Sequence, residues 1–193
     1  AGPIERATRL LPQFGKKRSF QYASAVNGLK QILWGLFKKV VIADNLGYFV
    51  ESIYSQPELY PSVIIWMAAI CFSIQIYCDF SGYSDIAIGS AKVLGYDLME
   101  NFRRPYFAKS IPEFWKRWHI TLSAWVRDYI YLPLGGKNIL LGIFPLFVSM
   151  FLRGLWHGAA WNFVLWGIYW FTITTLYRLM ARKKTASNIM NLL

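Results

Sequence analysis

Two long uncharged segments constrain the fold of this chain more than any other feature of its sequence. Leu59 to Cys78 contains no Asp, Glu, Lys or Arg over 20 residues, and Gly154 to Tyr177 contains none over 24. An α-helix rises about 1.5 Å per residue, so about 20 apolar residues cross the roughly 30 Å hydrocarbon core of a bilayer. Each segment is therefore predicted to form a membrane-spanning helix.

A third uncharged run, Ile139 to Leu152, is separated from the second long segment only by Arg153. Its 14 residues are few for a complete crossing, so we expect a re-entrant or tilted helix. Overall, 55% of the 193 residues are hydrophobic and 18% are aromatic; Trp and Tyr concentrate at membrane–water interfaces. The predicted fold class is all-α, a multi-pass transmembrane helical bundle with interfacial and re-entrant helices.

The chain carries a formal net charge of +11. A basic soluble protein could bind nucleic acid, but here the positive charges lie between apolar runs, as they do in the cytoplasmic loops of membrane proteins. We therefore expect the chain to lie in a lipid bilayer and not to bind nucleic acid. The basic groups are Lys16 to Arg18 with Lys30, Lys38 and Lys39; Arg103, Arg104, Lys109, Lys116 and Arg117; and Arg178, Arg182, Lys183 and Lys184.

The first half of the chain divides into four predicted segments. Residues 1–20 have the composition of a loop, and residues 21–55 that of an amphipathic helix whose lysines reach lipid headgroups by extending along the membrane surface. The first span is expected to end near Cys78 in a polar segment, Asp79 to Asp85. An apolar helix is expected to resume from Ile86 to Leu98.

A helix start is evident at Ser110. Ser110 can cap the helix, Pro112 suits its first turn, and Glu113 completes a capping box. Apolar side chains then recur at intervals of three and four, which predicts one continuous interfacial helix that ends near Pro133. Those side chains are Phe114, Trp118, Leu122, Trp125 and Tyr129.

His119 and His157 are the residues with the most evident capacity for proton transfer. An imidazole has a pKa near 6.5 and can take a proton from a hydroxyl at neutral pH. Each also has a structural alternative: His119 as a surface histidine among interfacial aromatics, and His157 as a hydrogen-bonding residue between membrane helices.

The other polar residues favour structural roles. Asp79 and Asp85 are expected to bind backbone N–H groups or basic side chains of the next loop. Arg127 and Asp128 are expected to have separate partners, because adjacent helix positions do not face each other. Cys71 and Cys78 have the spacing of packing residues, and the sequence predicts no metal site and no bound cofactor.

Four motifs give the chain a resemblance to the membrane-bound O-acyltransferase family, and in particular to its alginate O-acetyltransferase membrane-subunit branch. They are Asp79-Phe-Ser-Gly-Tyr-Ser-Asp-Ile-Ala-Ile-Gly89, Asn101-Phe-Arg-Arg-Pro-Tyr106, Phe114-Trp-Lys-Arg-Trp-His-Ile-Thr-Leu-Ser-Ala-Trp-Val-Arg-Asp-Tyr-Ile-Tyr-Leu-Pro-Leu-Gly-Gly136 and Leu155-Trp-His-Gly158.

The resemblance implies that residues 1–193 are a central part of a larger membrane domain and lack its flanking helices. It implies transfer of an acetyl group from a thioester donor, acetyl-CoA, towards an exported polysaccharide, with an extracytoplasmic acetyltransferase as partner protein. The expected location is the cell inner membrane.

The same resemblance implies that His157 and His119 are the catalytic residues, with His157 as general base. It also implies a donor or acceptor channel formed by Trp115, Arg117, Trp118, Arg127 and Asp128.

Four other functions are alternatives. Within the family, the alternatives are D-alanyl transfer to teichoic acid and peptidoglycan O-acetylation. Outside it, a transporter would use intramembrane His and Asp to line a pathway. A nucleic-acid-binding protein would have to be water-soluble, which the two membrane-length runs make improbable.

Overall fold

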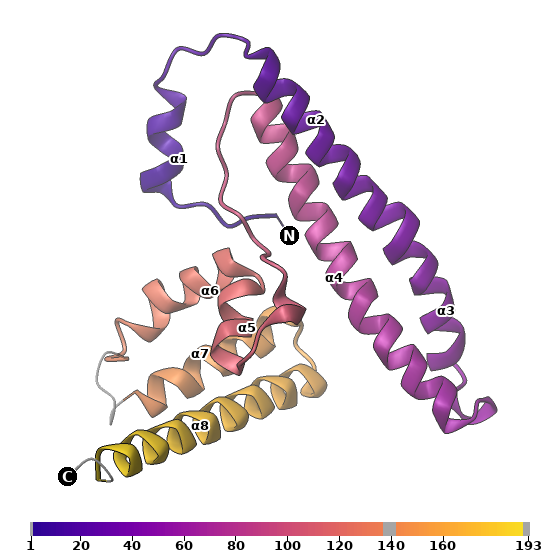
Figure 1. The fold of residues 1–193 in the computed structure, drawn as a ribbon, viewed down its shortest axis with the longest axis vertical. Helices are drawn as coiled ribbons and strands as arrows, with labels where there is room; N and C mark the ends of the chain where they lie inside the picture. The colour runs from indigo at the N-terminus through magenta and orange to yellow at the C-terminus, as the bar shows by residue number, and fades with distance from the viewer. Residues whose placement is uncertain (1, 137–141, 191–193) are drawn as a thin grey trace. The chain divides into compact units, whose positions relative to one another are not determined.

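The computed structural model describes residues 2–136 and 142–190, and every regular element in that part of the chain is a helix (Figure 1). The all-α prediction is therefore confirmed for the described residues. The chain divides into two compact units, Ala1–Arg103 and Arg104–Leu193. The start of the run predicted from Ile139 lies outside the described residues, as do the side chains of the basic group at Arg182, Lys183 and Lys184.

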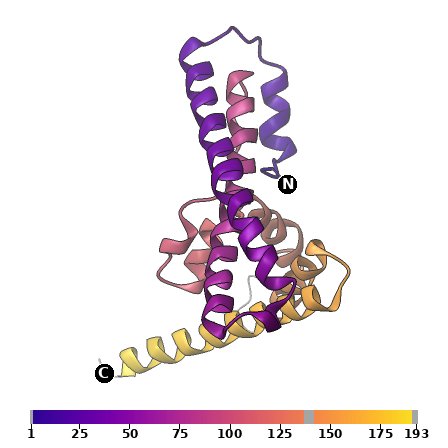
Figure 2. The same cartoon turned by 90° about the vertical axis from the view of Figure 1, so that its right-hand side faces the viewer.

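The first unit is built on two long antiparallel helical segments that lie side by side in both views (Figures 1 and 2). One runs without interruption from α2 through a π-helical segment into α3, as predicted for residues 21–55; the other is α4. The elements are α1 (Ala7–Phe14), α2 (Tyr22–Leu36), the π-helical segment Phe37–Ala43, α3 (Asp44–Tyr54), a 3₁₀ turn (Pro57–Leu59) and α4 (Ser62–Val93).

Glycines allow α2 and α4 to approach at backbone distance. Gly28 faces Gly89, and Gly35 faces Gly82, and a Cβ built on any of the four would lie 2.6–2.7 Å from the facing carbonyl oxygen. Small residues at a helix interface are the usual means of close packing between helices in a membrane. These positions therefore fix which faces of the two helices meet.

The predicted break at Asp79 to Asp85 is wrong, because this polar segment lies inside α4. Its polar groups are satisfied laterally: Lys38 Nζ donates to Ser81 Oγ at 2.9 Å and to Asp85 Oδ2 at 2.5 Å, and Lys39 pairs with Asp79 at 2.7 Å. The expectation that Lys38 reaches lipid headgroups is also wrong, since only 7% of it is exposed.

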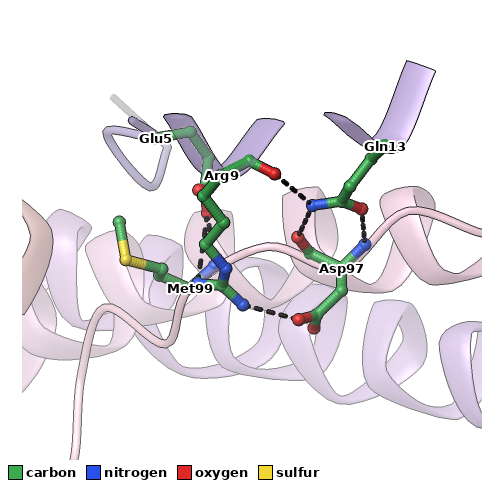
Figure 3. Close-up of polar contacts among 5 residues, drawn as sticks. All are labelled: Glu5, Arg9, Gln13, Asp97 and Met99. Atoms are coloured by element: carbon green, nitrogen blue, oxygen red, sulfur yellow. Dashed lines mark hydrogen bonds and ion pairs between the residues drawn. The ribbon is translucent and has the colours of Figure 1, made fainter. Parts of the chain in front are cut away.

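The N-terminal segment contains a helix, α1, where a loop was predicted. Figure 3 shows the hydrogen bonds and the ion pair that join α1 and the residues before it to the loop that follows α4. Arg9 Nη2 donates to Asp97 Oδ2 at 2.5 Å, and Gln13 exchanges two hydrogen bonds of 2.9 Å with the Asp97 backbone. Glu5 accepts the backbone N–H of Met99. These tertiary contacts stabilise a helix of eight residues, which is too short to persist alone.

Within the described residues, α4 is the one helix long and apolar enough to cross a membrane. Only 11% of its most apolar 18-residue window is buried inside the protein. A core helix of a soluble domain would be mostly covered by its own chain, so this exposed apolar surface suits a lipid or protein neighbour.

The second unit contains shorter helices. They are the 3₁₀ turn Pro105–Phe107, α5 (Ile111–Arg117), α6 (Ile120–Val126), the π-helical segment Arg127–Tyr131, α7 (Ile143–His157) and α8 (Trp161–Met190). Helices α7 and α8 form a hairpin in which Phe147 meets the edge of Phe171 at 5.3 Å and Leu146 and Met150 are buried.

Two predicted helices of this unit are wrong in extent. The helix predicted to continue from Ser110 past Trp118 ends at Arg117, because the backbone turns at Trp118 and His119. The span predicted from Gly154 is divided, because α7 ends at His157 and α8 begins at Trp161. The start at Ser110 is confirmed: Ser110 Oγ accepts the backbone N–H of Glu113, and Pro112 lies in the first turn.

Candidate functional site

His119 lies at the junction of α5 and α6 in a left-handed backbone conformation, with φ +44° and ψ +56°. A non-glycine residue adopts this conformation at a cost of about 1–2 kcal/mol, so surrounding contacts must hold it there. The turn draws the side chain inward, and His119 is 7% exposed. The alternative of a surface histidine is therefore wrong.

The surroundings of His119 favour its neutral form. Burial is the largest cause, and the nearby positive charge of Arg153 and the proximity of His157 act in the same direction; together they lower the pKa of the imidazole to about 4. A neutral imidazole has one N–H to donate and one nitrogen to accept. His119 can thus orient a hydroxyl or another imidazole at neutral pH, although it is a weak base.

His157 ends α7, and its ring is held by aromatic neighbours from α8. The ring meets Trp166 edge-on with centroids 5.0 Å apart, and lies nearly parallel to Phe163 at 5.9 Å. The next residue, Gly158, has φ +155° and ψ +155°, a conformation open essentially to glycine alone. This glycine lets the chain reverse directly after His157 while the imidazole remains exposed.

Trp115 connects the neighbourhood of His157 with Arg153. The Trp115 ring contacts the Trp166 ring with centroids 6.1 Å apart and the Trp170 ring with centroids 4.9 Å apart. Trp166 in turn contacts the His157 ring. The Arg153 guanidinium carbon lies 5.1 Å from the Trp115 ring centre, a separation typical of a cation–π interaction. The second unit therefore gathers both histidines, Trp115 and Arg153 in one neighbourhood.

The remaining predicted channel residues form two pairs in the chain, Arg117 with Trp118 at the end of α5 and Arg127 with Asp128 at the start of the π-helical segment. Trp118 stacks on Phe114 at 5.6 Å, and Arg117 pairs with Glu113, one turn away on the same helix. The expectation of separate partners for Arg127 and Asp128 is wrong: Arg127 Nε donates to Asp128 Oδ1 at 2.7 Å. The π-helical segment begins at this pair.

A cavity of about 320 Å³ opens beside this neighbourhood and contains two of the predicted residues, Trp115 and Arg127. Sequence reasoning missed Arg153, although a lone charge between two apolar runs is the pattern expected of a functional intramembrane residue. The lining residues are Pro112, Trp115, Lys116, Ser123, Val126, Arg127, Tyr131, Leu146, Ser149, Met150, Arg153, Thr174 and Arg178. In the described residues, no cluster of His, Cys, Asp and Glu has the form of a metal site.

Comparison with known proteins relates this arrangement to one family. The sequence profile of the membrane-bound O-acyltransferase family matches residues 1–192. A probable alginate O-acetylase of Azotobacter vinelandii is 41% identical over 96% of the chain and 38% of its own length. A peptidoglycan O-acetyltransferase of Helicobacter pylori is 41% identical over 87% of the chain and 33% of its own length.

A teichoic acid D-alanyltransferase of Bacillus subtilis is more distant, at 30% identity over 92% of the chain and 48% of its own length. The chain thus spans between a third and a half of the length of these three relatives. Because the profile covers nearly every residue and a relative 41% identical covers 96% of the chain, the chain belongs to the membrane-bound O-acyltransferase family.

Proposed function

We propose that the protein of which this chain forms part is a membrane-embedded O-acyltransferase. It moves an acetyl group from a cytoplasmic thioester donor, acetyl-CoA, towards the hydroxyls of an exported polysaccharide such as alginate. The family membership and the 41% identity to a probable alginate O-acetylase support this proposal. The structural observation that supports it most is the placement of both histidines in one unit, close enough for His157 to influence the pKa of His119.

In the proposed reaction, His157 is the general base. Its imidazole accepts the proton of the acceptor hydroxyl while the oxygen attacks the thioester carbonyl; the carbon–sulfur bond then breaks, and the proton passes to the departing thiolate. His119 stays neutral and orients the acceptor or the donor. Trp115, Trp118, Arg117, Arg127 and Asp128 are proposed to shape the channel or meet the anionic donor.

The proposed setting is a multi-pass protein of the inner membrane. Helix α4 has the length and exposed apolar surface for one crossing, and further crossings are proposed for the rest of the larger protein. An extracytoplasmic acetyltransferase partner would receive the acetyl group and complete its transfer to the polysaccharide. In that setting the exposed ring of His157 would face a channel.

The direct test is acetyl transfer from labelled acetyl-CoA by the purified full-length protein in liposomes. His157→Ala is expected to lower transfer at least about 100-fold, in line with the loss of a general base, with unchanged membrane insertion. Asn162→Ala is a matched control, because Asn162 lies at the exposed start of α8. Full turnover by a well-folded His157→Ala protein would contradict the proposal.

Alginate has a specific alternative as the acceptor of the acetyl group. The peptidoglycan O-acetyltransferase has the same 41% identity as the probable alginate O-acetylase, and D-alanyl transfer is supported more weakly by a relative at 30%. Parallel assays with alginate, peptidoglycan and teichoic acid separate these acceptors. Solute flux without consumption of an acyl donor would indicate a transporter instead.

A further inference from the structure

The charged side chains that line the cavity of the second unit are all positive. Its lining includes four cationic side chains, from Lys116, Arg127, Arg153 and Arg178. Residues 104–193 contain eleven Lys and Arg but only two acidic residues, Glu113 and Asp128. Glu113 pairs with Arg117, and Asp128 pairs with Arg127. In the described part of the chain, no carboxylate pairs with Lys116, Arg153 or Arg178.

Arg153 is the cation for which this imbalance matters most. It is 8% exposed, and its Nε lies buried without a hydrogen-bond partner among the described residues. Its position over the Trp115 ring provides a cation–π contact, but this contact leaves the Nε–H unpaired. A buried guanidinium without an anion is strongly unfavourable. The site is therefore incomplete as the chain alone presents it.

The atoms around Arg153 point to the missing group. In the described residues, Trp115 Nε1, Ser149 Oγ and Thr174 Oγ1 are also buried without partners, and all three residues line the cavity with Arg153. The indole and the guanidinium can only donate hydrogen bonds, and hydroxyls can donate as well. The lining thus combines several unpaired hydrogen-bond donors with positive charge that no described carboxylate neutralises. An anion with several acceptor oxygens would satisfy both.

We propose that this cavity is a phosphate-binding site in which Arg153 is the principal ligand. Ser149, Thr174 and the Trp115 indole supply neutral donors, and the exposed residues Lys116 and Arg178 supply further positive charge to the lining. A phosphate group suits this set because its oxygens accept paired hydrogen bonds from the guanidinium fork and retain oxygens for other donors. A cavity of about 320 Å³ is within the usual range for small-molecule sites.

Two sources would supply the same chemistry. One is the phosphate groups of a nucleotide-type thioester donor, in which case the inference rests on the proposed function. The other is the headgroup of an anionic phospholipid at the membrane surface. The same side chains would bind the phosphate in both cases, so the experiment must distinguish the sources.

The test is calorimetric titration of the detergent-purified full-length protein with coenzyme A and with inorganic phosphate, and of the liposome-bound protein with phosphatidylglycerol. Arg153→Gln is expected to weaken phosphate binding about tenfold or more, since it removes the charge and the paired donors. Lys109→Gln is the matched control: it removes a positive charge from the same unit at an exposed position outside the cavity. It is expected to bind as the unaltered protein does.

Ser149→Ala provides a second variant that keeps the charge, and it is expected to weaken binding to a smaller extent. If Arg153→Gln does not fold, Arg153→Lys replaces it, because a lysine keeps the charge but loses the fork. Loss of coenzyme A binding alone assigns the site to the donor, and loss of phosphatidylglycerol binding alone assigns it to a lipid headgroup.

His157→Ala separates this inference from the proposed function, because it should lose acetyl transfer and keep phosphate binding. Two results would overturn the inference. One is the absence of saturable binding of all three probes, as expected if a carboxylate elsewhere in the longer protein already neutralises Arg153. The other is equal affinity in Arg153→Gln and the unaltered protein.

Discussion

At the scale of single residues, the position of His157 depends on the backbone that follows it. Gly158 has φ +155°, and a Cβ at this position would lie 2.8 Å from Cε2 of Phe163. Phe163 is also the residue stacked against the His157 ring. A side chain at Gly158 would therefore strain the backbone and displace the aromatic neighbour of the imidazole at the same time.

Gly158→Ala is expected to reduce acetyl transfer at least about tenfold and to destabilise the protein by roughly 2–4 kcal/mol, from backbone strain and overpacking together. Gly135→Ala is the control, because Gly135 also has a positive φ (+89°) but open space around its Cβ position. Its cost should be limited to backbone strain. Activity assays and thermal unfolding of both variants test the difference, and equal losses would contradict the role of Phe163.

The residue scale also shows where sequence patterns fall short. His119 and His157 were identified from their motifs, but the sequence could not show that His119 is buried, because the left-handed turn that draws it inward has no composition of its own. Arg153 was passed over as an interruption between two apolar runs. Its importance follows from which side chains surround it, and those come from α5 and α8.

At the scale of elements, the pairing of the two long helical segments in the first unit depends on a buried charge network. Lys38 binds Ser81 and Asp85, and Gln31 Nε2 donates to Asp85 Oδ1 at 2.8 Å while Gln31 Oε1 accepts from Lys92 at 2.8 Å. Each of these bonds joins α2 or the π-helical segment to α4. The network thereby keeps a polar stretch within a helix that was predicted to break.

Lys38→Ala is expected to destabilise the protein by roughly 3 kcal/mol, because it leaves the partly buried Asp85 carboxylate without its cation. Lys30→Ala is the matched control: Lys30 is exposed on α2 and its loss should cost little. Chemical unfolding of the full-length protein in detergent measures both. Equal stability of the two variants would show that the network contributes nothing to helix pairing.

At the scale of the whole molecule, the burial of His119 links stability to pH. The folded-state pKa of about 4 lies below the ordinary value of 6.5. The folded state therefore disfavours protonation, so this contribution is complete above pH 6.5 and decreases as the pH falls from 6.5 to about 4. The full effect of His119 is on the order of 3 kcal/mol.

Replacement of His119 by Gln removes the titrating group, so the free energy of unfolding should depend less on pH between 6.5 and 4. Unfolding midpoints of the full-length protein between pH 7 and pH 4, compared with those of His119→Gln, measure the difference. An unchanged slope in His119→Gln would mean that other groups cause the acid sensitivity.

Local sequence patterns were enough to predict the helical class, the capped start at Ser110, the membrane-length apolar surface of α4 and the resemblance to the family. These are local features: periodicity, capping and composition depend on residues close together in the chain. Tertiary structure decided the rest. It kept Asp79 to Asp85 helical through lysines that lie 47 and 40 residues earlier in the chain. It also brought together Trp115 from α5, Arg153 and His157 from α7, and His119 from the turn between α5 and α6. A buried polar group is stable only where partners from elsewhere in the chain, or from a ligand, satisfy it.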